Sequence, residues 1–311
     1  MALGGARLPI RQVVALLLLA CALVAGGIYW FRVHHDVQPS SLVLYLPAAN
    51  ASVIYIDVDA LRRSGILNLV AGSKAVEDAD YKQFLNDTKF DYRQDLDTVA
   101  AAFKDGKVYV ALRGRFHWDS LKDFAIRQGG SCHEEFCVFP GSQPARRISF
   151  YPLKSDVMAM AIGPDDFAAY QVSTKAHGLA PVPPKEPVWA LIPAIELQRM
   201  DSLPAAAKAY VPALQGAEQI VFSVTTDANK QLQLGVQATC KDPAAATALV
   251  SQFENITSAL RQGLAKAHQK ADPGDLSGVL VAGSFRRSDR DVYAAWPLPQ
   301  AFLDTIASSA Y

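Results

Sequence analysis

The stretch VIYIDVDAL, residues 53–61, is matched in pattern by VWALIPAIE, residues 188–196, at a constant offset of 135 residues. Each begins with β-branched, aliphatic and aromatic residues, a composition typical of a β-strand. The same offset aligns SDVMAMAIGPDDFAAY, residues 155–170, with RDVYAAWPLPQAFLDT, residues 290–305. Five aligned pairs are identical, namely Asp156 and Asp291, Val157 and Val292, Ala159 and Ala294, Pro164 and Pro299, and Phe167 and Phe302. The pattern indicates two copies of one structural plan.

The order of predicted elements between these ends also repeats. DTVAAAF and KVYVALRG flank the turn KDGK at residues 104–107, while EQIVFSV and QLQLGVQA flank TTDANK at residues 225–230. Both arrangements predict a β-hairpin followed by a helix. The helix that begins at Pro243 is the clearer one, because its apolar residues recur at helical spacing. They are Leu249, Phe253, Ile256, Leu260 and Leu264.

We therefore expect an α+β protein with two similar domains, each an antiparallel or mixed sheet with helices packed on it. The ferredoxin-like plan, duplicated, is the nearest standard arrangement. The first domain would span residues 43–176 and the second residues 188–311. The proline-rich stretch HGLAPVPPKEP, residues 177–187, would link them.

An apolar run extends from Val13 to Phe31 and would be about 28 Å long as a helix, close to the thickness of a bilayer core. Arg7 and Arg11 precede it without an acidic residue, so the positive-inside rule places residues 1–12 in the cytoplasm. We expect a transmembrane anchor at 13–31, a linker at 32–42, and the bulk of the chain in the periplasm or outside the cell. A cleaved signal peptide or lipidation at Cys21 are the alternatives. The expected localisation is the cell membrane, with a single pass.

The stretch GGSCHEEFCVFPG, residues 129–141, contains Cys132 and Cys137. In an oxidising compartment two cysteines so close in sequence are candidates for a disulfide. Their C-x4-C spacing lacks the two-residue gap of thioredoxin-like sites, and zinc would need four ligands where Cys132, His133 and Cys137 offer three. A disulfide is the favoured interpretation, while a metal site, a redox pair and free thiols remain alternatives. We expect no bound metal and no cofactor.

Other groupings of polar or aromatic residues favour structural roles. Asp57 and Asp59 could act as paired carboxylates, but a strand-end charge and a helix N-cap at Asp59 are favoured. The stretch FDYRQDLD, residues 90–97, contains three aspartates and Arg93, and is interpreted as a solvated turn. RRSDRD, residues 286–291, is expected to be an exposed hairpin turn. Two tryptophans in predicted strands, Trp189 and Trp296, are expected in the core, and Trp118 is a weaker candidate for stacking on a ligand.

The charge balance and the motifs exclude several function classes. The chain has 30 basic and 30 acidic residues, so no electrostatic attraction for nucleic acid is expected. No Walker loop, G-x-G-x-x-G, G-x-S-x-G, H-E-x-x-H or EF-hand loop occurs. The sequence therefore identifies no catalytic residue.

The stretch LYLPAANASVIYIDVDALRRSGIL, residues 44–67, resembles bacterial exported proteins of unknown function with one N-terminal anchor and a tandem α+β architecture. The resemblance implies an envelope protein and assigns no catalytic residue to this sequence. Together with the sequence patterns, it favours a single-pass, non-enzymatic binding or assembly module whose partners are the bilayer and another envelope protein. One alternative is a membrane-anchored hydrolase, or another enzyme, with its site between the two domains. A receptor for a small hydrophobic ligand is a third possibility that the sequence does not separate from these.

Overall fold

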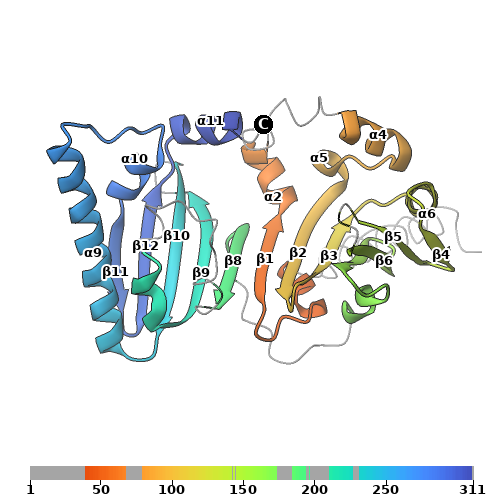
Figure 1. Ribbon diagram of the computed structural model, residues 1–311, viewed down its shortest axis with the longest axis horizontal. Helices are drawn as coiled ribbons and strands as arrows, with labels where there is room; N and C mark the ends of the chain where they lie inside the picture. Colours follow the sequence, from red (N-terminus) through yellow and green to blue (C-terminus); the bar gives the residue numbers. More distant parts are fainter. Residues whose placement is uncertain are drawn as a thin grey trace, which may run out of the picture. The chain divides into compact units, whose positions relative to one another are not determined.

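One antiparallel sheet of twelve strands dominates the structure (Figure 1). The computed structural model describes residues 39–67, 79–141, 143, 145–173, 184–193, 196, 210–226 and 231–309. By its contacts the chain divides into two units, residues 1–41 and residues 42–311, and the sheet belongs to the second. The strands are β1 (Ser52–Asp57), β2 (Leu96–Lys104), β3 (Lys107–Gly114), β4 (Ser131–His133), β5 (Phe136–Pro140), β6 (Arg147–Lys154), β7 (Val157–Gly163), β8 (Val188–Pro193), β9 (Ala217–Thr226), β10 (Leu232–Cys240), β11 (Ser284–Ser288) and β12 (Asp291–Pro297).

Short helices connect most of these strands, and one long helix, α9, packs on the sheet. The α-helices are α2 (Val58–Arg63), α4 (Ala79–Thr88), α5 (Tyr92–Asp95), α6 (Trp118–Arg127), α9 (Pro243–Lys266), α10 (Leu276–Val281) and α11 (Gln300–Ser309). The 3-10 helices are η1 (Pro39–Tyr45), η3 (Ala168–Gln171) and η4 (Pro212–Gly216). Asp242 begins α9 because its carboxylate accepts a hydrogen bond from the Ala245 amide, and Pro243 suits the first helical position.

The expected fold class, two separate sheet domains, is wrong. Strand β1 pairs with β2 on one side and with β8 on the other, so the sheet runs without a break from the first half of the chain into the second. Tyr55 of β1 lies opposite Trp189 of β8. The reason is that the outer edge of each predicted domain is an apolar strand with unpaired backbone groups, which pairing between the two edges satisfies.

The two sides of the β1–β8 pair have corresponding strand orders. Read outward from the pair, the first half continues β1, β2, β3, β7, β6 and the second half continues β8, β9, β10, β12, β11. The first half then extends by the short hairpin of β5 and β4. Each half therefore places its first strand at the centre of the sheet and its later hairpin toward the outside.

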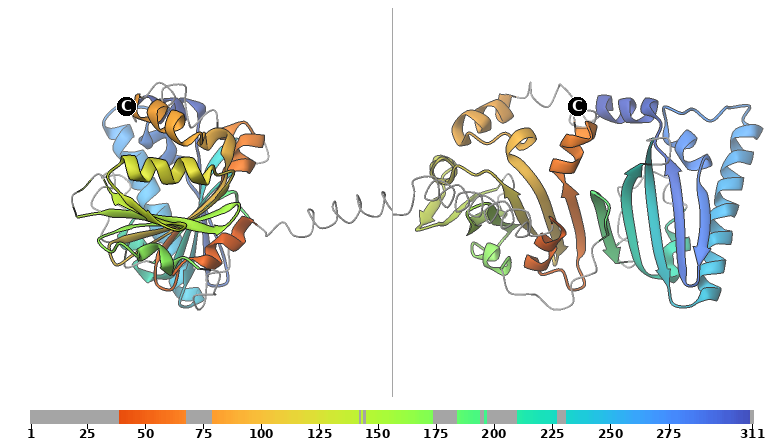
Figure 2. Two further views of the ribbon diagram at one scale, coloured as in Figure 1. Left: turned by 90° about the vertical axis from the view of Figure 1, so that its right-hand side faces the viewer. Right: turned by 180° about the vertical axis from the view of Figure 1, so that it is seen from behind.

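Helices α6 and α9 cover two parts of the same sheet face, which we call the α6/α9 face (Figures 1 and 2). Residues that are direct partners across neighbouring strands lie on one face, so the strand registers define a row across the whole sheet. Helix α6 packs on one end of this row and α9 on the other, which leaves the central strands between them. The row is Cys132, Cys137, Phe150, Met160, Val110, Ala101, Ile54, Ala190, Phe222, Val236, Ala294 and Phe285.

The opposite face is buried in the first half of the chain and polar in the second half. Helices η1 and η3 and the residues that directly follow them cover it with Leu42, Leu46 and Val172, which pack on the strand residues of the largest core cluster. In the second half, Ser223, Gly235, Gln237 and Tyr293 line a cavity of about 420 Å³ on this face. The two halves therefore share a strand order but not the covering of their faces.

The expected localisation, a single-pass membrane protein, also requires correction. No helix within the ranges that the structure describes is long and apolar enough to cross a membrane. Helix α9 has sufficient length, with 24 residues, but it carries Glu254, Arg261 and Lys266 and has an exposed polar face. The predicted anchor between Val13 and Phe31 lies outside the described residues.

Candidate binding cleft on the central strands

The two cysteines that the sequence singles out are joined in a cross-strand disulfide. Cys132 of β4 lies directly opposite Cys137 of β5, and their sulfur atoms are bonded. Cys137 is fully buried beneath α6 with Leu121 and Ala125, while the turn residue Glu134 has a φ of 54°. The bond therefore closes the outermost hairpin of the sheet. Within the part of the chain that the structure describes, no group of three His, Cys, Asp or Glu side chains could hold a metal ion.

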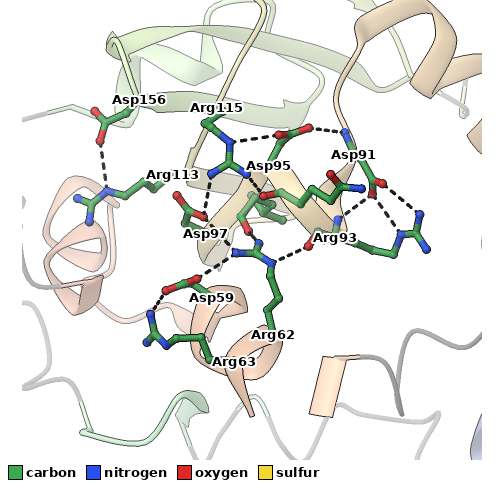
Figure 3. A network of polar contacts seen from close by, with 12 residues as sticks. Asp59, Arg62, Arg63, Asp91, Arg93, Asp95, Asp97, Arg113, Arg115 and Asp156 are labelled. Carbon is green, nitrogen blue, oxygen red and sulfur yellow. Dashed lines mark hydrogen bonds and ion pairs between the residues drawn. The ribbon is translucent and has the colours of Figure 1, made fainter. Parts of the chain in front are cut away.

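A network of arginines and aspartates gathers where α2 and α5 meet the start of β2 (Figure 3). Its centre is Arg62, whose Nε donates to the Arg93 carbonyl at 2.6 Å and whose Nη2 donates to the Leu96 carbonyl. The Nη1 atom of Arg62 lies 3.0 Å from Asp59 Oδ1 and 3.5 Å from Asp97 Oδ1. One planar guanidinium thus holds two carbonyl groups and two carboxylates, which fixes α2 against the start of β2.

Asp91 has a similar positioning role in the neighbouring turn. Its carboxylate accepts hydrogen bonds from the Arg93 backbone amide at 2.9 Å and from the Tyr81 hydroxyl at 2.8 Å, and it pairs with the Arg93 guanidinium at 3.1 Å. Burial alone would raise the pKa of Asp91, but the hydrogen bonds from Arg93 and Tyr81 outweigh it, and the pKa is lowered. Burial and the bond to Asp91 raise the pKa of Tyr81 to about 12. These groups therefore keep fixed protonation states near neutral pH.

The paired carboxylates considered in the sequence are structural. Asp57 is the N-cap of α2, because its Oδ1 accepts from the Ala60 amide at 2.8 Å. The prediction that Asp59 is the N-cap is thus wrong, because Asp59 pairs with Arg62 and Arg63. The prediction that residues 90–97 form a solvated turn is also wrong, since Asp91 is buried.

The remaining aspartates of this network also have arginine partners. Asp95 pairs with Arg115 at 3.3 Å, and Asp97 lies 3.9 Å from Arg115 as well as near Arg62. Burial raises the pKa of Asp97, and the two arginines reduce this effect. Because each carboxylate is matched by a guanidinium, the network fits a structural corner better than a pair of catalytic acids.

Two of the tryptophans are in the core, as predicted. Trp189 is 1% exposed and Trp296 is 5% exposed, and neither indole N–H has a hydrogen-bond partner within the described structure. Trp118 begins α6, and its indole donates to the Ser155 carbonyl at 3.2 Å. None of the three therefore forms an open stacking surface.

An open cleft of about 930 Å³ lies at one end of the central strands. Because side chains alternate between the two faces of a strand, the apolar residues of the cleft lie on the α6/α9 face. They lie on the central strands, which neither α6 nor α9 covers. Phe103 projects there with 43% of its surface exposed. Both halves of the chain contribute to the cleft. Its apolar floor is formed by Ile54, Phe103 and Val108 from the first half and by Ile192 from the second.

The rim of the cleft is polar and carries charges of both signs. Its charged lining residues are Lys104, Asp105, Lys107, Arg146 and Glu196. Lys107 lies 3.9 Å from Asp165, whereas Lys104 and Arg146 form no ion pair with any described carboxylate. An apolar floor beside two cations that have no described ion pair suits a ligand that combines an apolar group with an anionic one.

A second exposed aromatic surface lies outside this cleft. Phe167 and Tyr170 are 64% and 54% exposed, with ring planes 7° apart. Both stack on Phe136, whose ring centroid is 4.4 Å from that of Tyr170 and 5.8 Å from that of Phe167. No cavity adjoins these rings among the described cavities. Phe167 therefore provides a matched control for experiments on Phe103.

Sequence reasoning missed the cleft for two different reasons. The alternation in DTVAAAF already places Val99, Ala101 and Phe103 on one face, so the orientation of Phe103 could have been predicted from the sequence. Arg146 carried no such signal, because it lies in a loop before β6. The meeting of Ile54 with Ile192 depends on the β1–β8 pairing, which no local pattern indicates.

Comparisons with known proteins give only a distant likeness. No protein family and no curated protein matches the chain, so nothing among them supports the resemblance to exported, membrane-anchored proteins. Among solved structures, crystal form III of TP0453 matches with a TM-score of 0.47 and 10% sequence identity, over 86% of this chain and 97% of that chain. Crystal form IV of TP0453 matches with a TM-score of 0.45 and 10% identity, over 85% and 96%. At these values the likeness carries no argument about function.

Proposed function

We propose that this protein is a non-enzymatic binding module that holds a segment of a partner protein in the cleft on the central strands. The observation that carries the proposal is Phe103, a large aromatic side chain left 43% exposed on the floor of a 930 Å³ cleft. Exposed aromatic residues in concave surfaces are enriched at the centres of protein interfaces.

The mixed lining favours a polypeptide over a purely apolar molecule. Four side chains form the apolar floor, while Asn50, Ser52 and the charged rim supply hydrogen-bonding groups along the sides. An extended segment could place one apolar side chain on Phe103 and Ile54 and satisfy its backbone on the polar sides. Acidic residues in that segment would pair with Lys104 and Arg146.

The chemical groups of the cleft give the enzymatic alternative little support. Its described lining residues include two carboxylates, Asp105 and Glu196, and neither a histidine nor a cysteine. Asp105 lies in the hairpin turn between β2 and β3 and is exposed. The alternative nonetheless places an enzyme site at this same junction, so an experiment on the cleft bears on both.

The two halves are most simply understood as copies of one unit. We keep residues 43–176 and 188–311 as the two copies, and the corresponding strand orders on either side of the β1–β8 pair support this interpretation. Duplication would also explain the position of the cleft, because a cleft between two copies exists only after they have joined. Under this proposal, the polar cavity of the second half is a feature in which the two copies differ.

The test is site-specific photo-crosslinking in cells that express the full chain. Phe103 is replaced by the photoreactive analogue p-benzoylphenylalanine, and the same replacement at Ile126 and at Phe167 supplies controls of similar exposure. We expect one partner captured at position 103, no capture of that partner at the controls, and loss of capture when Arg146→Glu is added. The captured segment, synthesised as a peptide, is then titrated into the purified protein.

Binding of that peptide weakened about tenfold by Phe103→Ser, and unchanged by Phe167→Ser, would support the proposal. Equal capture at all three positions, or none at position 103, would overturn it. Cleavage or chemical modification of the bound peptide would establish the enzymatic alternative instead.

A further inference from the structure

The amphipathic stripe of α9 is only partly used by the core. Leu249 and Phe253 are 3% and 1% exposed, packed on the sheet beneath the helix. Farther along the same stripe Ile256, Leu260 and Leu264 are only half-buried. They form one side of a groove of about 520 Å³.

Helix α10 forms the other side of the groove with Leu280 and Val281. The remaining lining residues are Ala259, Gly263 and Ser277. Ser277 supplies the only side-chain hydroxyl, and it already donates to Asp275 Oδ1 at 2.5 Å. The groove therefore suits the apolar part of a ligand, because its one side-chain hydroxyl is already hydrogen-bonded. Its volume lies within the range of small-ligand sites.

A tethered guanidinium is bonded to Val281, one of the residues that line this groove. Arg261 Nε donates to the Val281 carbonyl at 2.9 Å, and its Nη2 donates to the same oxygen. A guanidinium has five N–H donors, so three remain after these two bonds. Arg261 is exposed and forms no ion pair with any carboxylate in the described ranges. A cation is thus held at a fixed place beside an apolar surface.

The other end of α10 carries the opposite charge. Asp275 is its N-cap and accepts hydrogen bonds from the Ser277 and Gly278 amides. Ser277 and Val281 are four residues apart, which is about 6 Å along a helix. The charge difference between the two ends gives the groove a direction, with the anion-attracting end at Arg261.

From this geometry we infer a second ligand site, independent of the cleft: the α9–α10 groove binds a small amphipathic anion. Its apolar tail lies between Leu260, Leu264 and Leu280, and its anionic head pairs with Arg261. A carboxylate and a phosphate monoester share the chemistry that a guanidinium recognises, and the choice of probes separates them.

The experiment measures displacement of the neutral apolar fluorophore N-phenyl-1-naphthylamine from the full chain by decanoate, decyl phosphate, decanol and decyltrimethylammonium. We expect the two anions to bind about tenfold more tightly than decanol, and the cation to bind least. The better of the two anions identifies the head group. Arg261→Gln should abolish the preference over decanol, and Arg261→Lys should retain most of it. Arg287→Gln, at an exposed arginine of β11 that forms no ion pair with a described carboxylate, should change nothing.

A second variant blocks the groove without removing any contact. A Cβ atom added at Gly263 meets no atom within 4 Å, so Gly263→Leu projects into open space beside the groove. We expect Gly263→Leu to fold and to bind every probe at least tenfold more weakly. Gly263→Ala should bind the probes as the wild type does. Equal binding of decanoate and decanol, or unchanged binding in Gly263→Leu, would overturn the inference. Because Phe103→Ser should leave these titrations unaltered, the result is separate from that of the cleft.

Discussion

The rings of Tyr55 and Trp189 stack with centroids 5.4 Å apart and planes 18° apart, directly across the strand pair that joins the two halves of the sheet. Both rings are nearly inaccessible to solvent. The β1–β8 pair is short, since β8 has six residues, so these two side chains supply much of the apolar contact across it.

Trp189→Ala should lower the free energy of unfolding by about 3–5 kcal/mol, because it leaves a cavity in the core at the strand pair that joins the halves. Trp189→Phe should cost less than about 1.5 kcal/mol, since it also removes a buried indole N–H that has no hydrogen-bond partner among the described residues. Urea denaturation followed by far-UV circular dichroism measures both. Phe167→Ala, at a ring that is 64% exposed, is the control and should change the free energy by less than about 1 kcal/mol. A loss for Trp189→Ala no larger than the control's would refute the role of this pair.

Arg62→Lys should destabilise the protein by about 1.5–3 kcal/mol. A lysine keeps the charge but cannot reach the Arg93 and Leu96 carbonyls together with Asp59 and Asp97. Arg63→Lys is the matched control, because the Arg63 side chain is 68% exposed and, among the described carboxylates, pairs only with Asp59. Its expected change is within about 0.5 kcal/mol. Equal midpoints of chemical denaturation for the two variants would show that Arg62 is not central to this corner.

The lowered pKa of Asp91 predicts an acid-sensitive contribution to stability. Its pKa in the folded state lies below the unfolded value of 3.8, so protons bind preferentially to the unfolded chain. The contribution is fully present above pH 3.8 and is lost as the pH falls through the folded pKa. Asp91→Asn should therefore cost about 1–3 kcal/mol at pH 7, and this cost should shrink below pH 3.8.

Asp97 provides the opposite case for the same measurement. Its pKa is raised in the folded state, so its contribution is present below pH 3.8 and is lost as the pH rises through the folded pKa. The difference in free energy of unfolding between wild type and Asp97→Asn should therefore move in the reverse sense between pH 3 and pH 7. Parallel pH profiles for the two variants would contradict the assignment.

Reduction of the disulfide should cost about 2 kcal/mol, because the bond closes a loop with a sequence separation of only five residues. Thermal denaturation with and without a phosphine reductant measures the effect. The Cys132→Ala/Cys137→Ala variant is the control, and the reductant should not shift its midpoint. Since Cys240 is fully buried and has no disulfide partner among the described residues, it should not contribute. A reductant effect that persists in the double variant would place the sensitivity elsewhere.

The sequence predicted local elements well where a pattern depends on neighbours along the chain. The hairpin around KDGK is confirmed by β2 and β3, whose turn residues Asp105 and Gly106 have φ values of 51° and 71°. Helix α9 spans Pro243–Lys266, and the predicted apolar stripe faces the core at Leu249 and Phe253. Local periodicity decides both, because the partners that matter lie within a few residues.

The arrangement of these elements could not be predicted in the same way. The alternation around Tyr55 shows a strand and its faces, but a strand at the edge of a domain and one at the centre of a sheet have the same alternation. The choice between two domains and one sheet depends on whether Tyr55 meets Trp189, and the two are far apart in sequence. The cleft could not be predicted for the same reason, since Ile192 lies beside Ile54 only because β8 pairs with β1.

The separation of Tyr55 and Trp189 along the chain also has a consequence for synthesis. A ribosome adds about 5–20 residues per second, so β1 emerges on the order of 10 s before β8 exists to pair with it. Once β2 has emerged it can protect one edge of β1, but until β8 exists the other edge presents free backbone groups to solvent and to neighbouring nascent chains. Conditions that slow translation between residues 57 and 188 should therefore increase self-association of new chains before they fold.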